Sequence, residues 1–118
     1  MSIIRKYSSE RSSEINIHNG TIYFSGQVAN DVTTGIKEQT KDCLKKMDAL
    51  LLEAGSDRDH ILSTSIFLRT MDDFAAMNEV WNEWIKHHEK PARACVEAKM
   101  ARKQILIEIC MIAAVKSE

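Results

Sequence analysis

The feature that most constrains the fold is a long apolar run near the end of the chain, residues 105–115, which Glu108 alone interrupts. It is far shorter than the roughly 20 residues that cross a bilayer, so no membrane span is expected. As a strand the run is apolar on both faces, and such a strand is normally buried on both. The rest of the sequence predicts two helices, which can cover one face of a sheet. We therefore expect another copy of the same chain to cover the second face, in an obligate oligomer.

Two segments have the periodicity of amphipathic helices. The first spans about 36–54, and Gly55 follows it as a natural C-cap. The second runs to His87 from Asp72 or Asp73, either of which can cap its N-terminus. The apolar stripe of this second helix consists of Phe74, Met77, Trp81, Trp84 and Ile85.

The other patterned segments indicate strands, and Asn19-Gly20 is a hairpin turn signal between two of them. The predicted strands are Ile3–Tyr7, Ile15–His18, Thr21–Gln27, Ile61–Arg69, Ala92–Ala98 and Ile105–Ala114. We expect the last two to pair antiparallel around a turn near residues 101–103. The order β-β-β-α-β-α-β-β predicts an α+β fold, a mixed sheet of five or six strands with both helices packed on one face.

Length, charge and cysteine content exclude several classes of protein. The 118 residues fit one domain, residues 1–118, without an internal repeat or linker. Sixteen Lys and Arg residues against seventeen Asp and Glu residues give no strong field for nucleic acid, so a nucleic-acid partner is not expected. Cys43, Cys95 and Cys110 form no Cys-x-x-Cys motif, so neither a disulfide scaffold nor a metal site is expected. Together with the lack of a secretory signal pattern, this predicts a reduced, cytoplasmic location.

Glu108 is the most unusual polar residue, because a carboxylate inside an apolar strand needs a partner to offset its desolvation. Arg93 is the candidate partner, since in the predicted hairpin it lies opposite about residue 110. The two-residue period places Arg93 and Cys95 on one face, and Glu108 and Cys110 on one face. Whether these two faces are the same stays open, as does the choice between a structural ion pair and a functional site.

Asn78 is a second candidate, because it lies four residues after Phe74, on or beside the apolar stripe of the second helix. A buried amide normally finds a hydrogen-bond partner, which favours a structural role. The alternative is that Asn78 points into a binding cleft.

Five short segments, in the same order along the chain, together form a recognisable set of motifs. They are Ser25-Gly26-Gln27, Glu53-Ala54-Gly55-Ser56, Asp73–Asn78, Pro91–Glu97 and Ile107-Glu108-Ile109. This set resembles the Rid family of YjgF-like reactive-intermediate deaminases, and the resemblance extends from about Asn19 to Ala114. The helix from Asn78 to Trp84 is most similar to the RutC-like branch of that family.

The resemblance implies a fold like that of bacillary chorismate mutase, assembled as a homotrimer whose sheets line a central barrel, with clefts between subunits. It implies that Arg93 binds the carboxylate of the substrate and that Glu108 positions the attacking water. The residues that it places around the substrate are Ser25, Gly26, Asn78, Ala94 and Cys95.

The implied reaction is hydrolytic deamination of 2-enamine or 2-imine acids of the 2-aminoacrylate type, which yields 2-keto acids and ammonia without a metal or organic cofactor. One alternative is a non-enzymatic trimer that binds small carboxylates, and a less favoured one is a ribonuclease or translation inhibitor. A second negative charge beside the carboxylate would weaken a pure binder, so Glu108 favours catalysis. Two departures from the family pattern are Met100-Ala101 in place of Leu-Pro, and Arg11-Ser12-Ser13 near the position of a Tyr.

Overall fold

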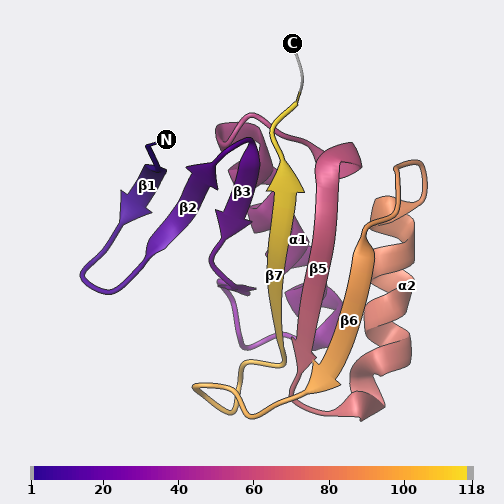
Figure 1. Cartoon of the computed structure of the whole chain (residues 1–118). Helices are drawn as coiled ribbons and strands as arrows, with labels where there is room; N and C mark the ends of the chain where they lie inside the picture. Colours follow the sequence, from indigo (N-terminus) through magenta and orange to yellow (C-terminus); the bar gives the residue numbers. More distant parts are fainter. Residues whose placement is uncertain (1, 117–118) are drawn as a thin grey trace.

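A computed structural model describes residues 2–116 of the chain, and it shows a mixed sheet with two helices behind it (Figure 1). The two helices are α1 (Ile36–Glu53) and α2 (Phe74–Ile85), and two short 3-10 turns precede β5 and α2, η1 (Arg58–His60) and η2 (Met71–Asp73). The strands are β1 (Ile4–Ser8), β2 (Ser13–His18), β3 (Thr21–Phe24), β4 (Gln27–Val28), β5 (Ile61–Leu68), β6 (Ala92–Glu97) and β7 (Ile107–Ala114). The predicted α+β class and the predicted order of elements are confirmed. Within the described residues the sheet has seven strands instead of the predicted five or six, because the predicted strand Thr21–Gln27 is divided into β3 and β4.

The strand order is β1-β2-β3-β7-β5-β6, with β4 also paired to β7. The predicted hairpin between the last two strands is wrong, because β5 lies between β6 and β7. The β5–α2–β6 crossover places β6 parallel to β5, as strand–helix–strand units do. The chain then passes around the end of β5, where Ala98 N donates to Leu68 O (2.9 Å) and Arg69 N donates to Leu106 O (3.0 Å). It returns as β7, antiparallel to β5 on the other side.

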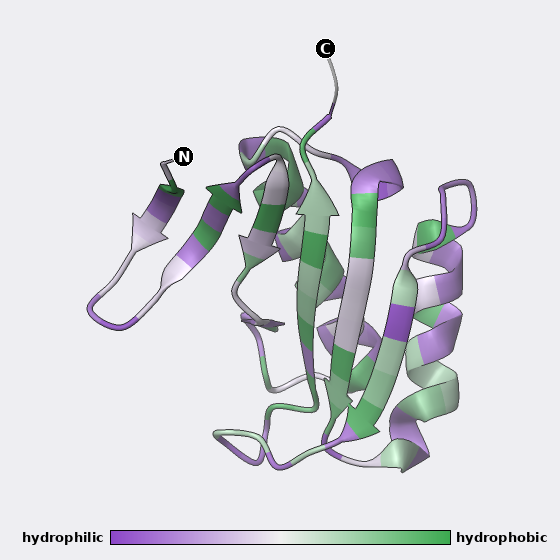
Figure 2. Cartoon of the chain, viewed as in Figure 1, coloured by the Kyte–Doolittle hydropathy of each residue, from purple (hydrophilic) through white to green (hydrophobic). Residues whose placement is uncertain are grey.

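Both helices lie on one face of the sheet, as predicted (Figure 1). Along β7 the alternation is strict: Ile107, Ile109 and Met111 are fully buried beneath the helices, whereas the residues between them are half-buried. Strand β7 is mostly hydrophobic, and the loop between α2 and β6 is polar (Figure 2). We call the face away from the helices the outer face. Its apolar residues include Tyr23 (48% exposed) and Val96 (49% exposed), which no helix of this chain covers.

Local signals account for most element boundaries. Asn19 (φ 53°) and Gly20 (φ 78°) form the tight turn between β2 and β3, and Gly55 (φ 81°) follows the C-terminus of α1. The predicted capping of α2 by an aspartate side chain is wrong. The Thr70 hydroxyl instead accepts a hydrogen bond from Asp72 N (3.2 Å) at the start of η2, and Asp73 makes no side-chain cap. Within residues 2–116, no helix is both long and apolar enough to cross a bilayer.

Candidate functional site

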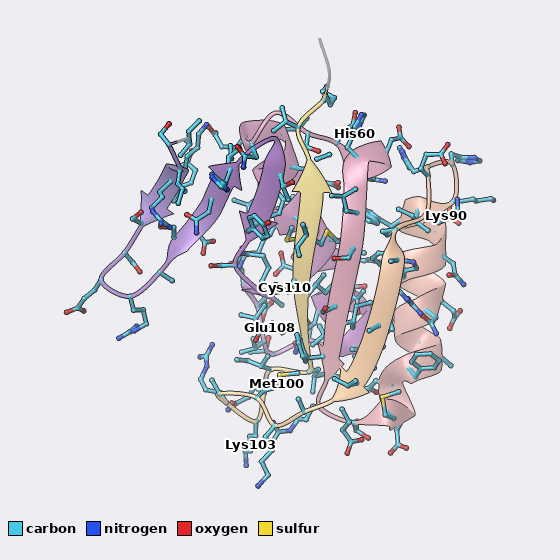
Figure 3. The ribbon with its side chains drawn as sticks, in the orientation of Figure 1. His60, Lys90, Met100, Lys103, Glu108 and Cys110 are labelled. Carbon is cyan, nitrogen blue, oxygen red and sulfur yellow. The ribbon has the colours of Figure 1, made fainter. Side chains whose placement is uncertain are left out.

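Glu108 lies on the outer face of β7, beside its register neighbours Phe67 of β5 and Val28 of β4. Its carboxylate lines a hollow of about 230 Å³, which Phe67 and the loop residues Ala98, Lys99 and Met100 complete. Figure 3 shows Glu108 and Met100 at the same end of β7. The lining therefore combines a carboxylate and a lysine with three apolar residues, and it exposes polar as well as apolar surface.

Gly26 is in direct contact with Glu108, because a Cβ built at this position would overlap Oε2 of the carboxylate. The two residues flanking Gly26 hold this backbone in place. The Ser25 hydroxyl donates to Ser13 O (2.7 Å), and the Gln27 amide donates to Glu14 Oε2 (3.1 Å) and to Ser25 O (3.1 Å). Gln27 is only 4% exposed, so these bonds satisfy its amide nitrogen away from water. The Ser-Gly-Gln motif thus connects β2 and β3 to the backbone beneath Glu108.

Arg93 lies on β6, and its side chain points to the helical side of the sheet. Its guanidinium carbon is 5.3 Å from the centre of the Trp81 ring on α2, within the range of a cation–π contact. Its register neighbour on β5 is Thr64, which is buried beneath the helices at 1% exposure. Arg93 itself is exposed, so its guanidinium can meet a solvent-borne anion.

Arg93 and Glu108 therefore lie on opposite faces of one sheet, on strands that β5 separates. The register joins Arg93 to Thr64 and Thr64 to Met111, all on the helical side, whereas Glu108 lies on the outer side. The predicted proximity of Arg93 and Glu108 within one chain is wrong, since it depended on a hairpin that does not form. The predicted sharing of faces by Arg93 with Cys95, and by Glu108 with Cys110, is confirmed.

The other predicted site residues divide between the two faces. Ala94 is exposed on the outer face, in the same row as Ser65 and Cys110. Cys95 packs against the core on the helical side, where burial raises the pKa of its thiol and the nearby Arg93 charge opposes that rise. Asn78 is half-buried on α2, and its side-chain oxygen is buried with no hydrogen-bond partner among residues 2–116. Ser25 and Gly26 lie with Glu108, as described above.

Sequence reasoning missed the residues that wall the hollow, Phe67, Lys99 and Met100. Met100 stands out in the sequence only as a departure from the family pattern and was not assigned to a site, because the position of this loop depends on how the chain passes around the end of β5. The contact of Arg93 with Trp81 was also missed, although Trp81 belongs to the predicted apolar stripe of this helix. In the described part of the chain, no group of three or more His, Cys, Asp or Glu side chains is arranged to hold a metal ion.

Comparison with known proteins gives one consistent result. Residues 4–115 match the family described as endoribonuclease L-PSP. A RutC family protein from Haemophilus influenzae is 44% identical over 114 residues, which cover 96% of this chain and 98% of that protein. The RutC family protein YoaB from Escherichia coli is 37% identical over 115 residues, which cover 98% of this chain and 100% of that protein.

Solved structures agree with the sequence relatives. A member of the YjgF protein family from Neisseria meningitidis superposes with a TM-score of 0.95 at 42% identity, covering 100% of this chain and 98% of that one. A member of the conserved Rid protein family from Yersinia pestis superposes with a TM-score of 0.84 at 33% identity, covering 92% and 90%.

Proposed function

This chain belongs to the YjgF/Rid family, and we propose that it hydrolyses reactive 2-imino acids and their enamine tautomers to 2-keto acids and ammonia. In this proposal Arg93 holds the carboxylate of the substrate and Glu108 positions the attacking water. The observation that carries it is the Glu108 carboxylate, which packs against the Gly26 backbone and lines a hollow beside Lys99 and the apolar residues Phe67 and Met100. A carboxylate placed in this way can accept a proton from water beside a bound substrate.

The reaction needs only two functions from the protein. Water attacks the carbon of the protonated imine while Glu108 accepts one of the water protons, and the new C–O bond gives a tetrahedral carbinolamine. Glu108 then returns that proton to nitrogen, the C–N bond breaks with its electron pair on the departing ammonia, and Glu108 passes the hydroxyl proton to the ammonia, so that the ketone and ammonium are the products. Arg93 suits the anchoring function, because a guanidinium binds a carboxylate through two parallel hydrogen bonds.

The opposite placement of Arg93 and Glu108 determines how such a site is assembled. A substrate short enough to be a small imino acid cannot bridge the two faces of one sheet. A second copy of the chain can supply Arg93 from its β6, which is an edge strand, to the Glu108 hollow of the first copy. We therefore place the site between subunits, which also agrees with the uncovered apolar residues Tyr23 and Val96.

The assembly that we propose is a homotrimer whose outer sheet faces line a central barrel. Closed rings form when each copy presents a different surface to each neighbour, and such rings repeat the same cleft at every junction. Each cleft would then contain Arg93 from one copy and Glu108 from the next.

The test is ketoacid release from 2-iminobutyrate, generated in the assay by a dehydratase. Arg93→Ala is expected to lower kcat/KM about 10- to 100-fold, the value of a charged hydrogen-bonded contact. Glu108→Gln keeps the shape of the side chain and is expected to lower kcat by about 10²- to 10⁴-fold. A folded oligomer that does not accelerate the reaction, but binds 2-ketobutyrate through Arg93, would be a carboxylate-binding protein instead of a deaminase.

Mixing the two variants tests the placement between subunits. If Arg93→Ala and Glu108→Gln chains are unfolded together and refolded at equal amounts, about one quarter of the clefts receive both native residues. Activity should return toward that fraction. The control is a doubly substituted chain mixed with either single variant, which restores no cleft. A lack of recovery in the first mixture would mean that one chain supplies both residues.

The family description also names endoribonuclease activity. The nearly balanced charge of this chain, 16 basic against 17 acidic residues, offers little for binding a phosphate backbone. We therefore do not propose ribonuclease activity, and an RNA substrate in the same assay series serves as the comparison.

A further inference from the structure

The Arg93 guanidinium lies over the indole of Trp81, one of the two tryptophans of α2. Trp81 is only 5% exposed, so its ring position is set by packing in the core. Arg93 has no ion pair and no side-chain hydrogen bond with any residue in the range 2–116. The cation–π contact, at 5.3 Å from the ring centre, is therefore what orients this guanidinium within the chain.

The Trp81 ring also packs against the ring of Trp84. Its ring centroid lies 5.4 Å from that of Trp84, at an interplanar angle of 44°. The Trp84 indole donates to Asp48 Oδ2 on α1 (3.1 Å), and the Arg58 guanidinium lies 4.6 Å from the centre of the Trp84 ring. Arg58 binds both carboxylate oxygens of Asp48 at 2.8 Å. The indole beneath Arg93 thus belongs to a network that joins α1, α2 and η1.

The two arginines that stack on these tryptophans differ in one respect. The hydrogen-bonding edge of Arg58 is occupied by Asp48, and this pair is partly buried, with 32% and 30% of the side chains exposed. The N–H groups of the Arg93 side chain have no carboxylate partner in the described chain. When a guanidinium lies on the face of an aromatic ring, its N–H groups point outward, parallel to that ring. There they can donate hydrogen bonds to a planar carboxylate.

We infer that Trp81 is a positioning residue for Arg93: its indole holds the guanidinium in the orientation that receives the substrate carboxylate. This inference rests on the proposed function for its kinetic consequence, but the orientation itself is a property of the free protein. Trp81 touches no reacting atom, so its loss weakens binding of the carboxylate more than it slows the chemical step.

The matched variants are Trp81→Phe and Trp84→Phe. Each shortens one tryptophan of α2, but only Trp81 contacts Arg93. Trp81→Phe should raise KM for 2-iminobutyrate about three- to tenfold, with kcat changed less than twofold, as expected for losing much of a cation–π contact. Trp84→Phe keeps an aromatic ring beside Trp81, whose own position is set by packing in the core, so it should leave KM within about twofold even where it lowers thermal stability. Equal KM effects of the two variants would overturn the inference.

A spectroscopic measurement keeps the inference independent of turnover. In the substrate-free protein, the side-chain protons of Arg93 should resonate upfield, because they lie above an indole ring. In Trp81→Phe the shift should shrink, and in Trp84→Phe it should persist. Side-chain protons of Arg93 at ordinary positions in the wild type would overturn the inference. An upfield shift in a protein that does not hydrolyse imines would instead sink the proposed function and leave the positioning role intact.

A double-substitution cycle completes the test. In an Arg93→Ala background, Trp81→Phe should have no further effect on binding of 2-ketobutyrate, because the guanidinium that it orients is gone. A further loss of the same size as in the wild-type background would show that Trp81 acts through the general packing of α2.

Discussion

The backbone of Gly26 lies against the carboxylate of Glu108 so closely that no side chain fits between them. Gly26 has no positive φ, so its conformation would suit any residue. Glycine is required here by space alone. The contact therefore links the Ser-Gly-Gln segment directly to the position of the carboxylate proposed to activate water.

Gly26→Ala should displace the Glu108 carboxylate from the hollow and lower kcat about tenfold or more, because a misplaced base loses its alignment with the attacked carbon. The Glu108 side chain is half-buried and can move aside, so we expect Gly26→Ala to lower the free energy of unfolding by only about 1–2 kcal/mol. Imine hydrolysis and urea unfolding of the same preparation measure the two effects.

Gly35→Ala provides the matched control. A Cβ at Gly35 meets nothing within 4 Å, and this residue is the N-cap of α1. Activity should be unchanged, and the free energy of unfolding should fall by about 1 kcal/mol, because alanine is a poorer N-cap than glycine. If Gly26→Ala were as harmless as Gly35→Ala, the steric role of Gly26 in placing Glu108 would be refuted.

Gln39 fastens the loop that walls the Glu108 hollow. Its side chain is fully buried, donates to Thr34 O (3.0 Å) and Gln104 O (3.0 Å), and accepts from Leu106 N (3.0 Å). Gln39→Met has a similar volume but leaves these backbone groups unpaired, so it should cost about 2–4 kcal/mol of unfolding free energy. Urea denaturation at a fixed protein concentration measures this loss, and amide exchange of Leu106 should quicken more than that of Ile109. Gln104→Met, at an exposed side chain, is the control and should be nearly neutral.

Cys43 is expected to stay unreactive until the chain unfolds. Burial raises the pKa of its thiol from 9.0 to about 12, and the thiol lies 3.4 Å from Gln27 O. The folded state holds this proton more tightly than the unfolded chain does. The thiol therefore lowers folding stability as the pH rises from about 9 toward about 12, and has no such effect below this range.

A variant that keeps Cys43 alone, with Cys95→Ala and Cys110→Ala, isolates this thiol. At pH 8.5 an aromatic disulfide reagent should label it far more slowly in buffer than in urea, because the thiolate is the reacting form. The variant that keeps only the half-buried Cys95 should show a smaller difference between the two conditions. Equal labelling of Cys43 with and without urea would contradict its burial.

Local sequence patterns correctly predicted the helices and turns that depend on interactions between neighbouring residues. The periodicity of residues 36–54 and the Asn19-Gly20 turn each depend on neighbours within a few residues, and both are confirmed. The pairing of β6 with β5, in place of β7, depends on a crossover and on competition for the two edges of β5. The sequence of residues 92–114 does not show this competition. It therefore favoured a hairpin, which does not form.

The candidate site divides in the same way. Arg93 and Glu108 were found from their residue types in apolar strands and from the family motifs. The observed strand order and register place them on opposite faces of the sheet, and the predicted strand order was wrong. Met100 and Lys99 reach the hollow only because Gln39 and the end of β5 shape their loop, a contact across more than 60 positions that no local pattern shows.

The two-faced placement of Arg93 and Glu108 has a consequence for how activity responds to dilution. If each cleft draws one residue from each of two copies, an isolated chain contains no complete cleft at all. Specific activity should then fall as the protein is diluted below the range in which subunits associate. A ligand that contacts both residues would oppose that fall, because it binds only the assembled form and so favours association by mass action.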